Sequence, residues 1–297
     1  MNTTYSAGDS NRLTREYFDS LLLETRYLDS ELPSTKLSLY GERFDTPIMT
    51  AALSHLHNIC EDGMVEFALG AKNANAVHWV GMGEDEELAH ITNTGAKTIK
   101  IIKPHANNDV IFHKIEHALH HNIFALGMDI DHAYSSNGSY DIVFDLPMRP
   151  KSTNEITDFV QASSVPFIIK GVLSAKDAEK SILAGAKGIV VSHHHGIMPY
   201  SVPPLLVLPE IVQAVNGQVP IFVDCGIESG MDAFKALALG ATAVCVGREL
   251  MGPLKEGNQG VTTRINSMTL ELMSIMARTG ARSLSEIDPS VIHFKHF

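Results

Sequence analysis

Three consecutive histidines form the segment of this chain best suited to moving protons. The sequence Ser-His-His-His-Gly occupies residues 192–196 and directly follows the apolar run of residues 188–191. Imidazole changes its charge near neutral pH, so it can accept or donate a proton, and it is also a common metal ligand. A short apolar strand that ends in titratable residues is typical of the chemistry-bearing end of a parallel α/β fold.

Similar apolar segments recur along the chain, and most of them end in polar, charged or small residues. We predict strands over residues 47–52, 76–80, 98–102, 124–129, 166–171, 188–192, 220–224 and 243–246. Helical patterns follow over residues 62–71, 109–120, 154–162, 174–184, 204–215, 230–239 and 260–279. Strand–helix alternation repeated eight times favours a (β/α)8 barrel over an open sheet.

The predicted barrel domain covers residues 46–297, and residues 1–45 form an N-terminal helical extension. In such a barrel the carboxyl ends of the strands meet at one face, where the active site lies. We therefore expect the strand-end residues to converge there, among them Lys103, Asp129, Asp131, Lys170, Asp224 and Arg248.

Composition excludes several classes of function. The chain has 297 residues and a net charge of −11, which argues against a nucleic-acid partner and against binding to anionic membranes. No apolar run is long enough to cross a bilayer. The polar N-terminus shows no secretory signal, and three cysteines at no metal spacing fit a reducing compartment, so we expect a cytoplasmic protein.

Five segments in this order resemble the FMN-dependent 2-hydroxy-acid dehydrogenase/oxidase family, which includes glycolate oxidase and lactate oxidase. They are Phe-Ile-Ile-Lys-Gly-Val at 167–172, Ile-Val-Val-Ser-His-His-His-Gly at 189–196, Val-Asp-Cys-Gly-Ile at 223–227, Phe-Lys-Ala-Leu-Ala-Leu-Gly-Ala at 234–241 and Val-Gly-Arg at 246–248. The resemblance implies a (β/α)8 barrel, an FMN cofactor, a small-molecule substrate and a homo-oligomer, commonly a tetramer.

The resemblance also implies which residues hold FMN. They are Ala51, Ala52, Leu53, Lys100, Lys170, Ser192, Asp224, Gly226, Gly247 and Arg248. Lys170 would lie beside the flavin ring and tune its electronics, and Asp224 would hold the ribityl hydroxyls. The backbone of Gly226 and Gly247, with the Arg248 guanidinium, would hold the phosphate.

For catalysis, the resemblance implies His195 as the general base, Asp129 as its carboxylate partner, and Lys170 as support for the reduced flavin. A carboxylate beside the ring stabilises the imidazolium that forms when the base takes a proton. The chain carries one extra residue in this segment, so the asparagine that the family places before its base is His193 or His194 here.

Several departures from the family pattern fall in the site. Met198 replaces one arginine that binds the substrate carboxylate, and residues 131–137 lack the second. Ile102 takes the place of a tyrosine, and Glu228 takes the place of an arginine in the phosphate loop. Loss of two guanidinium groups removes bidentate carboxylate recognition. We therefore predict a substrate that is not a plain 2-hydroxy acid.

Three other hypotheses remain open at this point. One is a flavin-dependent isomerase that resembles type 2 isopentenyl diphosphate isomerase, which also lacks the two arginines. Another is a non-catalytic barrel in which Arg248 pairs with Glu228 instead of a phosphate. The third is a metal hydrolase that uses His193 and His195, which share one face of a strand. No carboxylate lies at a metal-ligand spacing from them, so we predict no metal.

Overall fold

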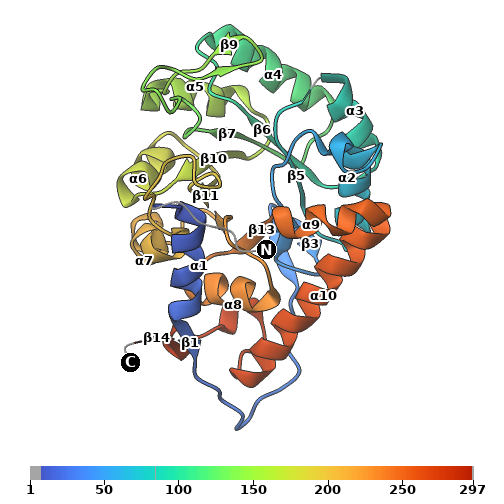
Figure 1. The fold of residues 1–297 in the computed structure, drawn as a ribbon, viewed down its shortest axis with the longest axis vertical. Coiled ribbons are helices and arrows are strands. Elements are labelled where there is room, and N and C mark those ends of the chain that lie inside the picture. Colours follow the sequence, from blue (N-terminus) through green and yellow to red (C-terminus); the bar gives the residue numbers. More distant parts are fainter. Residues whose placement is uncertain (1–7, 84, 296–297) are drawn as a thin grey trace.

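Eight parallel strands form a ring at the centre of the protein (Figure 1). The structure is a computed structural model that describes residues 8–83 and 85–295. The ring strands are β4 (Ile48–Thr50), β5 (His78–Val80), β6 (Thr98–Ile102), β7 (Ala125–Asp129), β10 (Phe167–Val172), β11 (Gly188–Val191), β12 (Ile221–Val223) and β13 (Ala243–Val246). All eight strands predicted from the sequence are present, with small differences at their ends.

The ring is closed between its first two strands. Hydrogen-bonded neighbours run in the order β4-β13-β12-β11-β10-β7-β6-β5, and each pair is parallel. A parallel bridge joins Leu53 to Val80, and the Gly81 amide donates to the Leu53 carbonyl at 2.9 Å. These contacts join β4 to β5, which confirms the predicted (β/α)8 barrel.

Helices cover the outside of the ring (Figure 1). They are α2 (Gly63–Asn73), α3 (Asp85–Asn93), α4 (Asn108–His120), α5 (Thr153–Ala162), α6 (Ala175–Leu183), α7 (Pro204–Val215), α8 (Gly230–Ala238), α9 (Arg248–Met251) and α10 (Gly257–Arg278). Serine side chains cap several of these helices, and Ser152 forms a capping box with Glu155 before α5. Helix α3 is absent from the sequence prediction because its Asp-Glu-Glu first turn obscures the apolar periodicity.

Two hydrophobic layers explain why the strands are apolar on both faces. One cluster fills the barrel interior with Trp79, Ile101, Ile168 and Phe222 among its members, and the other lies between strands and helices. Side chains alternate along a strand, so residues two apart share a face. By this rule Lys170 follows Ile168 into the interior, whereas Lys100, between Ile99 and Ile101, points to the outer layer.

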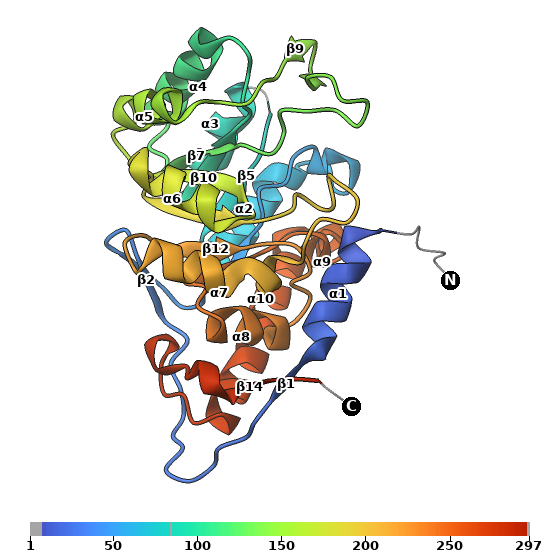
Figure 2. The same cartoon turned by 90° about the vertical axis from the view of Figure 1, so that its left-hand side faces the viewer.

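A helix from the N-terminal segment lies beside the loops that follow β11 and β12 (Figure 2). Helix α1 (Ser10–Ser20) begins at the capping carboxylate of Asp9 and leads into β1 (Leu21–Leu23). Strand β1 pairs antiparallel with β14 (Ile292–Phe294) near the other end of the chain. The predicted boundary near residue 45 stays a prediction.

Two hairpins stand outside the ring. Strands β2 (Leu37–Leu39) and β3 (Glu42–Phe44) precede the first ring strand, and β8 (Ile142–Val143) pairs with β9 (Leu146–Pro147) in the loop after β7. None of the helices in residues 8–83 and 85–295 is both long and apolar enough to span a membrane.

Candidate active site

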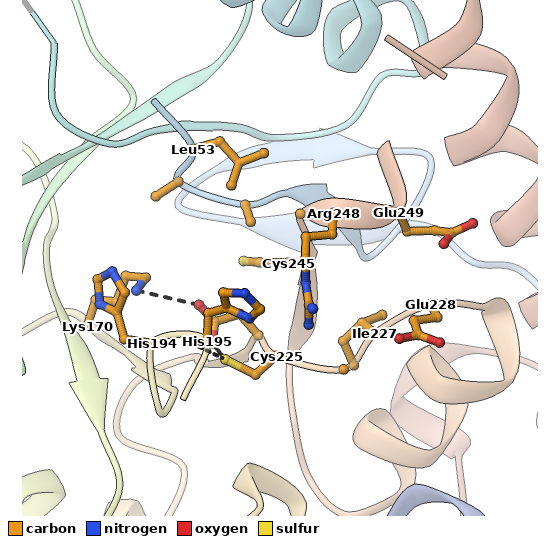
Figure 3. A pocket seen from close by; sticks show the side chains of 15 residues that line it. Leu53, Lys170, His194, His195, Cys225, Ile227, Glu228, Cys245, Arg248 and Glu249 are labelled. Carbon is orange, nitrogen blue, oxygen red and sulfur yellow. Dashed lines mark hydrogen bonds and ion pairs between the residues drawn. The ribbon is translucent and has the colours of Figure 1, made fainter. Parts of the chain in front are cut away.

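A cavity of about 290 Å3 lies at the carboxyl ends of the barrel strands. Eight of the ten residues predicted to hold FMN line it: Ala51, Ala52, Leu53, Lys170, Asp224, Gly226, Gly247 and Arg248. Figure 3 shows Lys170 and His194 toward one end of this cavity and Arg248 and Glu228 toward the other. We call it the main cavity.

A buried charge cluster forms the inner end of the main cavity. The Lys170 ammonium lies 3.1 Å from Asp129 Oδ1 and 3.5 Å from Asp224 Oδ2. The other oxygen of Asp129 accepts a 2.7 Å hydrogen bond from Lys103 Nζ. Burial opposes the charge of Lys170, but Asp129 and Asp224 outweigh it and raise the lysine pKa well above its usual value. Lys170 therefore stays charged at neutral pH.

The same cluster keeps the Asp129 carboxyl group ionised. Burial raises the pKa of its carboxyl, but Lys170 and then Lys103 act in the opposite direction and hold the pKa far below its usual range. A carboxylate fixed by two ammonium groups is a strong electrostatic support and a poor proton acceptor.

His194 is the histidine that meets these carboxylates. Its Nδ1 lies 3.0 Å from Asp131 Oδ1 and 3.7 Å from Asp129 Oδ1. The ring also contacts His132, with the ring centroids 4.8 Å apart. Because Nδ1 faces a carboxylate, we assign its hydrogen there, which leaves Nε2 as the nitrogen able to take a proton. His194 lines the main cavity and has the carboxylate-oriented geometry of a general base.

His195 occupies a different place from the one predicted. Its Nδ1 lies 2.8 Å from Asn11 Oδ1 of helix α1, and its backbone amide faces Cys225 Sγ at 3.4 Å. His195 still lines the main cavity, on the side of Arg248, but it does not pair with Asp129. The contacts of the loop with helix α1 are the reason: His193 binds Thr14 and His195 binds Asn11, which leaves His194 facing the carboxylates.

His193 is a structural residue. Its Nδ1 accepts a hydrogen bond from the Gly196 amide at 2.9 Å, so Nε2 must carry the hydrogen and donate to Thr14 Oγ1 at 2.7 Å. The side chain is buried, and burial lowers its pKa. With both ring nitrogens engaged, His193 cannot join His195 in the metal site considered from the sequence.

Two residues predicted to hold FMN lie away from the main cavity. The buried Ser192 hydroxyl accepts from the His194 amide at 3.0 Å, so it shapes the histidine loop. Lys100 donates to the Gly81 carbonyl and lines a second cavity instead. Lys100 is at an outward-facing position of β6, which explains that placement. Roles for both residues in cofactor binding stay predictions.

The opposite end of the main cavity contains Arg248. Its Nη2 donates to Asn11 Oδ1 at 3.2 Å, a neutral partner, and no carboxylate of the described residues forms an ion pair with the guanidinium. Glu228 does not pair with it: the Glu228 carboxylate lies 3.8 Å from Arg15 Nη1 of helix α1. Arg15 is in turn held by Asp232 at 2.8 Å. The pairing that motivated a non-catalytic barrel is thus absent between these described residues.

The main cavity fits a flat, anionic cofactor. Small side chains line much of it, and a Cβ built on Gly247 would lie 3.4 Å from Ala51 Cβ and 3.6 Å from Leu53 Cδ2. A side chain at residue 247 would therefore fill the space between β4 and β13. The Lys170 cation lies at the inner end and the Arg248 cation at the other. These are the charges that a flavin ring and a phosphate would meet.

A metal at the inner end is disfavoured on electrostatic grounds. Asp129, Asp131 and His194 bring possible ligand atoms within 4.8 Å of one another. Both oxygens of Asp129, however, already face ammonium groups, and two nearby positive charges oppose a divalent cation.

Sequence reasoning did not assign roles to several residues at this site. Asp131 had a detectable signal, because its spacing of two from Asp129 places both carboxylates on one face. Lys103 stands at a strand end, which is also a visible signal. Asn11, Thr14 and Arg15 had none, since nothing local indicates that an N-terminal helix packs against loops about two hundred residues away.

The chain is similar to proteins of one known family. The family model of the FMN-dependent dehydrogenases matches residues 2–161 and 148–294. A 2-hydroxyacid oxidase of Dictyostelium discoideum is 27% identical over 328 residues, which cover 97% of this chain and 84% of that protein. The 2-hydroxyacid oxidase 2 of Homo sapiens is 28% identical over 321 residues, which cover 97% of this chain and 92% of that protein.

A solved structure shows the same fold. Mandelate oxidase with (S)-2-phenylpropionate superimposes with a TM-score of 0.88 at 24% identity, covering 98% of this chain and 90% of that one.

Proposed function

Because the chain belongs to the FMN-dependent dehydrogenase family, we propose that it uses FMN to oxidise a hydroxyl-bearing small molecule other than a plain 2-hydroxy acid. The family assignment confirms both the predicted resemblance and the predicted cofactor. When bound, FMN supplies the hydride acceptor that such an oxidation requires.

In this proposal His194 is the proton acceptor. The observation that carries it is the 3.0 Å contact between His194 Nδ1 and Asp131 Oδ1 in a residue that lines the main cavity. The contact fixes the ring and its tautomer, so Nε2 is directed to the substrate hydroxyl proton. Asp131, with Asp129 at 3.7 Å, stabilises the imidazolium that forms. Lys170 would place positive charge beside the flavin ring.

The cations of the main cavity support the substrate part of the proposal. Of its described lining residues, Lys170 and Arg248 carry a permanent positive charge. Lys170 is flanked by two carboxylates, and Arg248 lies toward the opposite end from His194. Met198, at the position of a family arginine, has a side chain that is 59% exposed. A carboxylate next to the reacting carbon would therefore lack a guanidinium partner at His194.

Anaerobic reduction of the FMN-loaded protein tests both parts. We expect lactate, glycolate and mandelate to bleach the flavin slowly and neutral analogues such as lactamide to bleach it faster. With a reducing compound in hand, His194→Gln should slow the reduction by a factor of about 100 or more. The matched variant His195→Gln should stay within a few-fold of the wild type.

Each outcome has a definite meaning. Fast bleaching by lactate or glycolate would overturn the substrate proposal, and a large loss in His195→Gln alone would return the base to His195. The other hypotheses predict different results in the same protein. A non-catalytic barrel would not combine FMN binding with flavin reduction by a substrate, and a flavin-dependent isomerase would turn over isopentenyl diphosphate in its reduced form.

A further inference from the structure

A second cavity of about 150 Å3 lies at the carboxyl ends of β5 and β6, under the β8–β9 hairpin. It shares none of its described lining residues with the main cavity. Lys103, which lines the second cavity, pairs with Asp129, the carboxylate that contacts Lys170 of the main cavity. The proposed function assigns no role to this cavity.

One wall of the second cavity contains a buried lysine without a close carboxylate among the residues that the structure describes. Lys100 is 9% exposed, and its ammonium donates to the Gly81 carbonyl. Burial lowers the Lys100 pKa to about 8, with a further contribution from Lys114, while Glu87 and Asp85 act more weakly in the opposite direction. A buried ammonium whose hydrogen-bond partner is a carbonyl is stabilised by any anion that reaches it.

Other polar groups on this wall also suit an anion. Lys114 of α4 lies 3.7 Å from Asp85, a half-exposed carboxylate that compensates its charge only in part. His105 is 6% exposed, and its Nδ1 has no hydrogen-bond partner among the described residues. An unpaired buried imidazole nitrogen is costly unless a ligand or water meets it.

The facing wall is apolar and comes from the hairpin. Val143, Phe144 and Leu146 line it. Phe144 has a φ of +50°, a left-handed conformation that is unusual for an aromatic residue. Its ring packs edge-on against His55, with centroids 5.7 Å apart. The hairpin thus holds a phenyl group over a cavity whose other wall is cationic.

We propose that the second cavity binds a small amphiphilic carboxylate. The carboxylate would lie among Lys100, Lys114 and His105, and the hydrocarbon would pack against Val143, Phe144 and Leu146. A cavity of this volume holds a compound of about six carbon atoms, since one of similar size accommodates benzene. The cavity thus selects a short-chain or aromatic acid over a bare inorganic anion.

Calorimetric titration of the FMN-loaded protein with hexanoate tests this proposal. We expect saturable binding of one hexanoate per chain at millimolar or lower concentration, and binding of uncharged hexanamide at least about tenfold weaker. Lys114→Gln should weaken hexanoate binding by a similar factor. Lys180→Gln is the matched control, because Lys180 is also a helix-surface lysine, 3.8 Å from Asp177, and should change nothing.

Three results would overturn the proposal: no saturable hexanoate binding, equal binding of hexanamide, or equal effects of Lys114→Gln and Lys180→Gln. The titration does not depend on turnover, so its failure is distinct from a failure of the proposed function. Competition then identifies the source of the carboxylate. If hexanoate competes with the compound that reduces the flavin, the substrate carries the carboxylate. If both bind together, the cavity takes a separate ligand.

Discussion

The charge of Asp131 should be worth about a hundredfold in the rate of flavin reduction. Asp131→Asn keeps an oxygen that can accept from His194 Nδ1 but removes the negative charge. At 3.0 Å and an effective dielectric constant of about 20, a carboxylate stabilises an imidazolium by roughly 5 kcal/mol. Both side chains are partly exposed, at 14% and 24%, so we halve this value to about 2–3 kcal/mol. That energy corresponds to roughly a hundredfold in rate.

Anaerobic stopped-flow absorbance at saturating substrate measures this rate. A matched control exists in the same loop, because Asp141 holds His132 Nδ1 at 2.8 Å in a second carboxylate–histidine pair. Asp141→Asn removes the same charge from a histidine that does not line the main cavity, so its rate should stay within about twofold of the wild type. If the flavin of the Asp131→Asn variant, with FMN still bound, is reduced at the wild-type rate, the assignment of Asp131 as the partner of the base is refuted.

Two further predictions concern the cofactor and the buried charges. Arg248→Met should weaken FMN binding by roughly 10- to 100-fold in a fluorescence titration. Glu228→Gln removes a carboxylate from the same end of the cavity and should strengthen FMN binding. Equal FMN affinities in the wild type and the two variants would contradict a phosphate near Arg248. Asp129→Asn should lower the free energy of unfolding by about 3–5 kcal/mol, because it leaves Lys103 and Lys170 without their shared counterion. The folded-state pKa of Asp129 is lowered, so its stabilisation is complete above its unfolded pKa of about 4 and is lost as the pH falls below that value. Urea unfolding between pH 3 and 7 should therefore show a steeper acid loss in the wild type than in the variant.

Local patterns predicted the barrel well because each strand is short, apolar on both faces and followed by a small or polar residue. The same regularity placed Asp129, Lys170 and Asp224 at one site, since all three continue the inward face of their strands. The alternation of side chains along β6 also predicts that Lys100 lies away from that site. Ile99 and Ile101 belong to the interior cluster, so the lysine between them points outward.

The histidine segment could not be resolved in the same way. Three identical side chains in a row carry no internal sign of which one faces the carboxylates. Their assignment depends on Thr14 and Asn11, which come from a helix far away in the sequence. Long-range packing of this kind has no local pattern, and the same holds for Arg15, which compensates Glu228.

The three histidines make different contacts, and this limits which deletions the loop can tolerate. His193 anchors the loop to Thr14, His194 faces Asp131, and His195 contacts Asn11. Loss of any one of the three codons produces the same chain, Ser-His-His-Gly, whichever codon is lost. Two imidazoles would then have to serve three contacts, so the shortened loop would give up either its anchor to α1 or the histidine that faces the cavity. A one-residue deletion here is therefore a change of register, and a shortened loop that kept both the anchor and the cavity-facing histidine would require compensating changes in helix α1.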